Sequence, residues 1–220
     1  MPTYIIFDLE FMVVRKPHHL ADIIEIGAVK MTEHEGAPVI TDKFHSYVKP
    51  SRQYKLTPDT TPFTGITQEQ VNQAPSYPEV LETFLEWIGE DPYYLCAWGP
   101  DDKYQLIQHC RYHHLPLDWL QNYNDIQLAF TRLHHSDHRQ RFGLKRALEH
   151  LQLPFDGEPH HAADDAWNTA KIFASIFSKI ELVTNNAAEE KLYVSEVVYS
   201  TGHNENHPFS RLAEMLGMAQ

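Results

Sequence analysis

Short apolar runs and alternating stretches dominate the first part of the chain. Residues 3–7 (TYIIF) and residues 22–31 (DIIEIGAVKM) are mostly apolar, and residues 41–50 (TDKFHSYVKP) alternate between apolar and polar side chains. Patterns of this length are typical of strands, and Pro50 at the end of the third one marks a turn. Three successive strands with short connections predict an antiparallel meander.

Helical periodicity begins after the meander. Residues 67–74 (TQEQVNQA) start with a threonine and carry a glutamine three positions later, which is the capping-box arrangement of a helix start. Residues 78–89 (PEVLETFLEWIG) place their apolar side chains on one helical face between a proline and a glycine. Residues 93–98 (YYLCAW) predict a fourth, central strand, and a helix is expected after Pro100.

The second half of the chain adds helices at residues 142–151 and 161–180, and a short strand around residues 123–126. Three strands followed by helices, a strand and more helices predict an α/β domain with a mixed sheet. We expect this domain to span residues 1–180. Residues 181–220 differ in character and predict an extension with a strand, a loop and a short helix, packed on the domain.

The composition is that of an ordinary globular protein, with 220 residues, 42% hydrophobic and 22% charged. We find no run long enough and apolar enough to cross a bilayer and no signal peptide, so we expect a cytoplasmic protein without a membrane partner. Cys96 and Cys110 lack metal-site or disulfide spacing, which predicts two buried thiols.

The formal net charge of −12 argues against clamping of long duplex DNA, where neutralising phosphates dominates affinity. It is compatible with an enzyme that meets a short single strand in one groove and gathers carboxylates around metal. The 15 histidines are interpreted mainly as surface residues, with a histidine-rich metal tract as the alternative.

The first candidate site is the acidic pair that ends the first strand. Asp8 and Glu10 lie two residues apart, so a strand places both carboxylates on one face and Phe7, Leu9 and Phe11 on the other. Two such carboxylates at the end of a buried strand are costly unless they are protonated or bind a cation. Their hard oxygen ligands suit Mg²⁺ or Mn²⁺, and an exposed strand end is the alternative interpretation.

A second acidic pair follows the fourth strand. In WGPDDKYQL, Asp101 and Asp102 lie where the strand passes into a helix. Either residue could cap the helix N-terminus. One cap needs one residue, which leaves the other aspartate available as a ligand.

The third site lies in HHAADDAWNTA. Asp164 and Asp165 fall in the first turn of a long helix, where negative charge is favourable without any ligand. His160 and His161 precede this helix and could be ordinary loop residues. Alternatively, the aspartate binds metal while the histidine five residues before it serves as a general base.

Together, FDLEF, WGPDDKYQL and HHAADDAWNTA resemble the motifs of the DnaQ-like (DEDDh) 3′–5′ exonuclease superfamily. The resemblance covers roughly residues 3–180 and includes the TPFTGITQEQVNQAPSYPEVLETFLEWI segment. It is strongest with the branch of histone-mRNA 3′-end exonucleases and bacterial sporulation-inhibitor-like proteins. This resemblance implies a ribonuclease-H-like exonuclease fold, in which helices flank a mixed five-stranded sheet.

The resemblance also implies a reaction and its residues. The metal-binding carboxylates of the family fall on Asp8, Glu10, Asp102 and Asp165, and its catalytic histidine falls on His160. The doubled histidines and aspartates leave a one-residue slip open. The implied cofactors are two divalent ions, Mg²⁺ or Mn²⁺, and the implied products are nucleoside 5′-monophosphates.

The implied partner is the 3′ end of a single-stranded RNA or DNA, with RNA favoured because the branch that looks closest acts on RNA. In relatives, residues after the first motif and in the TGI loop lie near the terminal nucleotide. Many relatives also carry a cysteine just before TGI, where this chain has TTPF. The corresponding candidates for substrate binding here are Phe11, Met12, Phe63, Thr64, Gly65 and Ile66.

Two other functions fit parts of the pattern. A binding module could keep the fold and act as a regulator without catalysis, but such a module has no need for an intact and costly acidic cluster. A phosphatase or small-molecule hydrolase could use a similar two-metal site. The TGI segment and its neighbouring phenylalanine argue against that second alternative.

Overall fold

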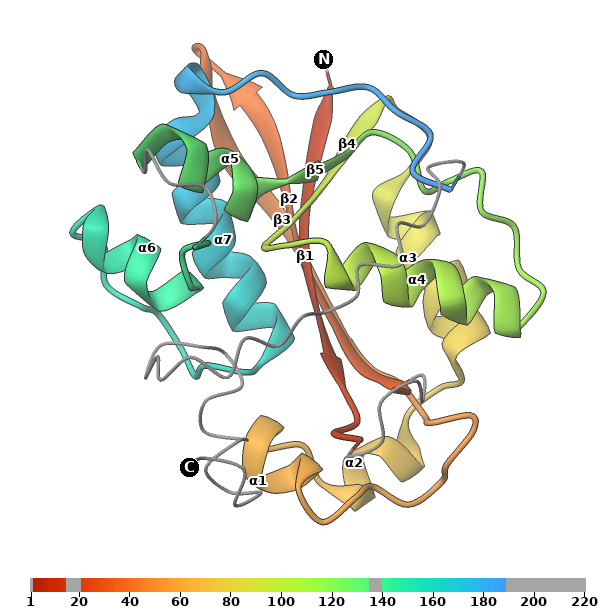
Figure 1. Ribbon diagram of the computed structural model, residues 1–220. Helices are drawn as coiled ribbons and strands as arrows, with labels where there is room; N and C mark the ends of the chain where they lie inside the picture. Colours follow the sequence, from red (N-terminus) through yellow and green to blue (C-terminus); the bar gives the residue numbers. More distant parts are fainter. Residues whose placement is uncertain (1, 15–20, 135–139, 189–220) are drawn as a thin grey trace.

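A mixed five-stranded sheet forms the centre of the computed structural model, which describes residues 2–14, 21–134 and 140–188 (Figure 1). The strand order is β3-β2-β1-β4-β5, in which β2 is antiparallel to its neighbours β1 and β3, and β1, β4 and β5 are parallel. The predicted meander and mixed sheet are confirmed, although β1 and not β4 is the central strand. The strands are β1 (Thr3–Phe11), β2 (Ile23–His34), β3 (Ala37–Tyr47), β4 (Tyr93–Ala97) and β5 (Tyr123–Asp125).

The helices follow the order expected from the sequence, with two additions. One is a single turn at the TGI segment, which ends at Gly65 with a φ of 74°, and the other continues directly from β5. No helix within the described ranges is long and apolar enough to cross a membrane. The helices are α1 (Thr60–Thr64), α2 (Gln68–Gln73), α3 (Tyr77–Ile88), α4 (Asp101–Tyr112), α5 (Ile126–His134), α6 (Leu144–His150) and α7 (Ala162–Ile176), followed by the 3-10 turn η1 (Phe177–Lys179).

Hydrogen bonds define the starts of two helices: α2 starts as predicted, and α3 starts at Tyr77, one residue before the predicted Pro78. Thr67 and Gln70 form a capping box at α2, and Ser76 does so with Glu79 at α3. Helix α3 then ends at Gly89, whose N–H donates to Leu85 O. These local bonds satisfy backbone groups that a helix end leaves without partners, so nearby residues determine where α2 starts and where α3 starts and ends.

The sheet separates two hydrophobic layers (Figure 1). Ile5, Phe7 and Leu9 of β1 pack with α3 and α4 on one face, whereas Tyr4 and Ile6 pack with α5, α6 and α7 on the other. Both cysteines are free and buried, as predicted, one in each layer. Because side chains alternate along a strand, the acidic residues of β1 continue the face that α7 covers.

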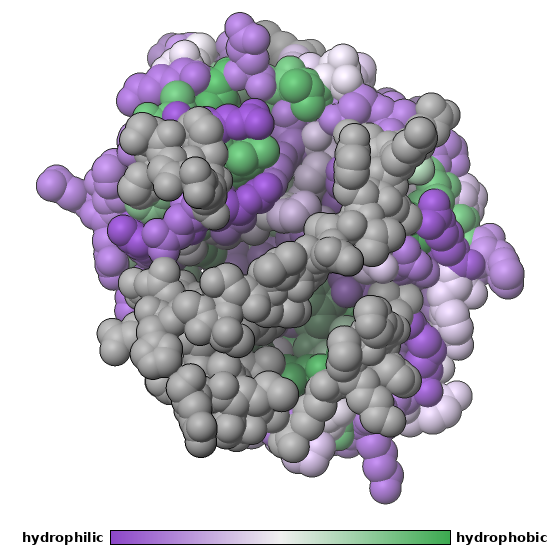
Figure 2. Space-filling model, viewed as in Figure 1, coloured by the Kyte–Doolittle hydropathy of each residue, from purple (hydrophilic) through white to green (hydrophobic). Residues whose placement is uncertain are grey.

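The outer surface in view is mainly hydrophilic, with smaller hydrophobic areas between the polar ones (Figure 2). The large hydrophobic side chains exposed in the described part of the chain are spread over several elements as single residues of an ordinary surface. They are Val39, Tyr54, Tyr104, Tyr112, Leu133 and Val183.

After η1 the chain returns to the edge of the sheet at β5. Asn185 O accepts a hydrogen bond from Asn122 N–H, and Ala187 N–H donates to Leu120 O. Ala187 is fully buried against the layer of α3 and α4. The strand and helix predicted further along the extension lie outside the described residues, so the packing expected for residues 189–220 stays a prediction.

Helix α7 starts so close to β2 that only glycine fits beneath it. A Cβ atom on Gly27 would overlap the backbone of Ala162 and Ala163 at the helix start. Gly27 is also the strand partner of Asp8. This close approach brings the first turn of α7 to the acidic end of β1.

We therefore expect Gly27→Ala to lower the free energy of unfolding by about 1–3 kcal/mol, because backbone and not a flexible side chain must move. Equilibrium urea unfolding measures the change. Gly143→Ala is the matched control, since its Cβ would meet no atom within 4 Å. Equal destabilisation by both substitutions would contradict the close-packing explanation.

Candidate active site

The acidic pair of β1 lies under the start of α7. Glu10 is 6% exposed, and burial followed by the nearby charge of Asp165 raises its pKa well above the usual range. Burial also raises the pKa of Asp8 well above its ordinary value, with Asp102 and Asp165 as the next causes. Both carboxylates feel the charges of Asp102 and Asp165, as expected if they share one face, and Glu10 is buried while Asp8 is partly exposed, so the pair is not an exposed strand end.

Asp102 joins this pair from the first turn of α4. It is buried, it accepts a hydrogen bond from Leu9 N–H, and burial followed by the charge of Asp101 raises its pKa well above the usual range. Asp101 is exposed. Pro100 is the N-cap residue and no side chain caps the helix, so the alternative role of these aspartates as caps is not adopted.

Asp165 and His160 come from the start of α7. The His160 N–H donates to Asp165 Oδ2 at 3.2 Å, while Asp165 Oδ1 is buried without a hydrogen-bond partner in the described structure. Burial raises the pKa of Asp165 to about 7. Ligand atoms of Glu10, His160 and Asp165 lie within 4.8 Å of one another. The predicted residues of three distant motifs thus converge.

The two histidines before α7 point to different places. The His160 ring lies 4.3 Å from the Phe63 ring, and the residue has a φ of 64°, which non-glycine residues rarely adopt. His161 is the N-cap residue, and its Nε2 lies 3.2 Å from Glu25 Oε1. Since His160 alone shares a cluster with Glu10 and Asp165, the geometry supports His160 over a one-residue slip.

Helix α1 is tied to the segment after β1. Thr60 Oγ1 accepts a hydrogen bond from Val13 N–H at 3.0 Å, and Thr57 Oγ1 donates to Val13 O at 2.6 Å. These bonds hold the two segments that carry the candidate substrate residues side by side. Phe63 then lies against His160, at the border of the carboxylate cluster that Asp8, Glu10, Asp102 and Asp165 form.

The six candidate substrate residues divide by burial. Phe11 and Phe63 are partly exposed and Gly65 is exposed. Met12 and Ile66 are only 2% and 1% exposed and pack together in a small cluster beneath the loop. Thr64, the sixth residue, is buried as well, and its hydroxyl donates a hydrogen bond to the backbone of α1.

Glu25 is a buried carboxylate next to the site that the sequence analysis did not select. It is fully buried and is the strand partner of Glu10. Its Oε2 accepts a hydrogen bond from Ala162 N–H at 2.9 Å, which fixes the first residue of α7 to β2. A single acid inside the otherwise apolar run IIEIGAV was the signal that could have identified it.

The raised pKa values predict how stability depends on pH. Asp165 has a pKa of about 7 in the folded protein, above the value of an unfolded aspartate, and the pKa values of Asp8, Glu10 and Asp102 shift in the same direction. The contribution of these groups is therefore fully present at low pH and is lost as the pH rises through about 7. Protonated carboxyls do not repel one another, which is the physical reason.

Urea unfolding in chelator should accordingly show a free energy of unfolding that falls between about pH 5 and pH 8. Excess Mg²⁺ should weaken this decline, because a bound cation favours the ionised carboxylates. A free energy of unfolding that rises over the same interval without metal would show that these carboxylates are not strained by their proximity.

The comparisons with known proteins identify the family. The model of the RNase T exonuclease family matches residues 5–173, from β1 through α7. The chain belongs to the RNase T exonuclease family. This exonuclease is of the DEDDh type, with the ribonuclease-H-like fold predicted from its motifs, and divalent metal ions are expected for its family.

Two relatives illustrate the similarity of the exonuclease. "Probable 3′-5′ exonuclease KapD" of Bacillus subtilis is 29% identical over 175 residues, which is 78% of this chain and 82% of that protein. "3′-5′ exoribonuclease 1" of Mus musculus is 31% identical over 163 residues, which is 70% of this chain. The match spans only 46% of the mouse protein, so it concerns one part of that relative.

A solved structure agrees with the observed fold. The nuclease domain of 3′hExo, described as a DEDDh family member bound to rAMP, is 27% identical to this exonuclease. The two superpose with a TM-score of 0.71, covering 83% of this chain and 94% of that one. The similarity therefore covers nearly the whole of that nuclease domain.

Proposed function

We propose that this exonuclease is metal-dependent and hydrolyses single-stranded nucleic acid from its 3′ end, RNA in preference to DNA, to nucleoside 5′-monophosphates. The observation that carries the proposal is the convergence of buried and partly buried carboxylates from β1, α4 and α7 beside His160. Repulsion among these carboxylates has no structural benefit, but such a group of hard oxygen ligands suits divalent cations.

The residues present fit two divalent ions, Mg²⁺ or Mn²⁺. Asp165 Oδ1 is buried and has no hydrogen-bond partner in the described part of the chain, which is costly unless a ligand satisfies it. In the proposal, the protein ligands of the two ions are Asp8, Glu10, Asp102 and Asp165. Bound ions of this kind supply positive charge that acidifies a water molecule and offsets charge developing at the phosphate.

His160 is the proposed general base, which takes the proton from the attacking water. Its backbone N–H bond to Asp165 and its ring contact with Phe63 hold the imidazole at the edge of the carboxylate cluster. A base placed by such contacts needs little rearrangement when the substrate arrives.

The terminal nucleotide is proposed to lie against Phe11, Phe63 and Gly65, which are accessible from outside. Aromatic side chains stack on any base, so this contact tolerates different sequences. Met12 and Ile66 are too deeply buried to touch a nucleotide and would support the loop from below, with Thr64 closing the turn. The exoribonuclease name of the mouse relative and the bound rAMP of 3′hExo favour RNA.

A time course on 5′-labelled single-stranded RNA and DNA oligomers tests this proposal. We expect a ladder of products that shorten one nucleotide at a time from the 3′ end, faster for RNA, in Mg²⁺ or Mn²⁺ but not in chelator. Chromatography of unlabelled products should give nucleoside 5′-monophosphates. Metal-independent cleavage, or immediate release of a labelled mononucleotide, would reject the mechanism.

The same experiment separates the rival functions. An inactive binding module would retain the oligomer without shortening it, and a phosphatase would release only inorganic phosphate from a 3′-phosphorylated oligomer. We also propose, as the sequence predicts, that residues 1–180 are the exonuclease domain and residues 181–220 an extension. The cytoplasmic location stays a prediction.

A further inference from the structure

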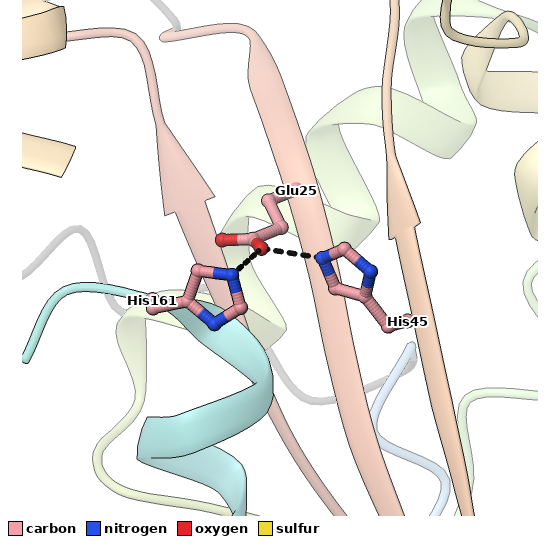
Figure 3. A group of neighbouring side chains, drawn as sticks. All are labelled: Glu25, His45 and His161. Atoms are coloured by element: carbon pink, nitrogen blue, oxygen red, sulfur yellow. Dashed lines mark hydrogen bonds and ion pairs between the residues drawn. The ribbon is translucent and has the colours of Figure 1, made fainter. Parts of the chain in front are cut away.

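A second group of side chains of the types that can bind a metal ion lies beside the carboxylate cluster. Glu25 of β2, His45 of β3 and His161 at the start of α7 point toward one another (Figure 3). Glu25 Oε1 lies 2.6 Å from His45 Nε2 and 3.2 Å from His161 Nε2. The three ligand atoms lie within 4.8 Å of one another, although their residues are far apart in the sequence.

The carboxylate is oriented as a ligand would be. Its Oε2 accepts the Ala162 N–H, which leaves Oε1 facing both imidazoles. Glu25 is fully buried, whereas the side chains of His45 and His161 are 37% and 33% exposed. The carboxylate is therefore held in the protein interior while the two imidazoles are open to solvent, so an ion can reach the group.

The second nitrogen of His161 adds independent support. Among the described residues, His161 Nδ1 is buried without a hydrogen-bond partner, and it lies 3.5 Å from Asp164 Oδ2. Asp164 is itself held by a hydrogen bond from Glu158 N–H at 2.9 Å. A histidine that binds metal through one nitrogen usually directs the other toward a carboxylate in this way.

The two nitrogens of His161 create a conflict that a cation resolves. Neutral imidazole carries one N–H, yet Nε2 faces Glu25 and Nδ1 faces Asp164. One lone pair must then point at a carboxylate, which is repulsive. The conflict disappears if Nδ1–H points to Asp164 while the Nε2 lone pair binds a metal ion, or if the ring is doubly protonated.

We propose that Glu25, His45 and His161 form a site for one imidazole-preferring divalent transition-metal ion, of which Zn²⁺ is the best match. Two histidines and one glutamate are a known ligand set for zinc, with a fourth position left to water. Mg²⁺ prefers oxygen ligands and does not compete well for imidazole nitrogen. The site is thus distinct from the carboxylate cluster in both residues and metal preference.

An ion at this site would join three elements. β2, β3 and the first turn of α7 each contribute one ligand, and the same turn of α7 carries Asp165. Binding to the folded state alone stabilises that state. The expected consequence is a tighter attachment of α7 to the sheet next to the acidic cluster.

Co²⁺ in excess Mg²⁺ is the probe, because Co²⁺ replaces Zn²⁺ and absorbs visible light strongly when histidine ligands lower its coordination number. We expect one equivalent of absorbing Co²⁺ per chain, displaced by Zn²⁺. His45→Gln and His161→Asn should each weaken binding by more than ~100-fold, and Asp164→Asn by ~10–100-fold through loss of the partner that orients the ring.

The controls separate this site from the acidic cluster. His34→Gln, on the exposed end of β2, should bind Co²⁺ as the wild type does, and the absorption should persist in Asp8→Asn. Asparagine is a favourable N-cap residue, so His161→Asn should keep its urea midpoint without metal. That midpoint should rise on adding Zn²⁺ in the wild type and not in this variant.

Three results would overturn the proposal. Absorption that survives in His161→Asn would place the ion on Glu10, His160 and Asp165. The second such result is that Co²⁺ gives no visible absorption with the wild type, and the third is that Zn²⁺ leaves the wild-type urea midpoint unchanged. Either would mean that His161 is doubly protonated and that the group is only an ion pair. Because none of these readouts requires hydrolysis, they do not depend on the proposed exonuclease activity.

Discussion

Asp8→Asn should abolish most hydrolysis and at the same time stabilise the metal-free protein. Asp8 lies between the other carboxylates, with its pKa raised first by burial and then by Asp102 and Asp165. Removing its charge relieves that repulsion, so we expect a gain of about 1–2 kcal/mol in the free energy of unfolding, the size commonly seen when a functional strain is relieved. Loss of a shared metal ligand should reduce kcat/KM by at least ~10³-fold, or about 4 kcal/mol of transition-state stabilisation.

Urea unfolding in chelator measures the first effect and the oligomer time course measures the second. Asp91→Asn is the matched control, because Asp91 is an exposed aspartate in the turn before β4. It should change neither quantity appreciably. Stabilisation by Mg²⁺ should also shrink in Asp8→Asn. A variant that is destabilised in chelator, or that retains near wild-type kcat/KM, would remove Asp8 from the proposed cluster.

The strands and most helices could be predicted because local rules dictate them. Alternation along β1 sends successive side chains to two different hydrophobic layers, and capping boxes define the starts of α2 and α3. Helices α1 and α5 were not predicted, since one is a single turn and the other follows β5 without a break. Such short or continuous elements give no separate periodicity to detect.

The positions of the carboxylates proposed as ligands were also predictable, because these residues lie where buried strands end or helices begin. Two features could not be predicted, namely the register between β1 and β2 and the close packing of α7 on β2. Glu25 lies next to the site only because β2 pairs it with Glu10 and because Gly27 allows the start of α7 to pack closely on β2. Both facts depend on long-range packing, which the spacing of residues along the chain does not contain.

His109 shows the same limit for histidines. It is 1% exposed in α4, its Nε2 accepts a hydrogen bond from Ile23 N–H, and its Nδ1–H donates to Gln105 O. Burial lowers its pKa to about 4, so the ring stays neutral. Composition suggested mainly surface histidines, yet this one satisfies the backbone at the start of β2.

The second large effect is expected on kcat, and it should differ between the two histidines before α7 because their rings contact different groups. His160→Asn should lower kcat by ~10²–10⁴-fold, the usual contribution of a general base. Asparagine tolerates the φ of 64° found at this position, so the fold should be retained. Stabilisation by Mg²⁺ should persist, because the four carboxylates remain in place.

His161→Asn is the matched comparison, since it changes the neighbouring residue to the same side chain and keeps a good helix cap. Its ring is engaged by Glu25, away from the carboxylate cluster, so its kcat in Mg²⁺ should fall by less than ~10-fold, the change produced by 1.4 kcal/mol. The limb of the pH–rate profile that reports the general base should be lost only in His160→Asn. If His161→Asn shows the larger loss instead, the general base is His161, and the start of α7 must turn this ring away from Glu25 and toward the substrate.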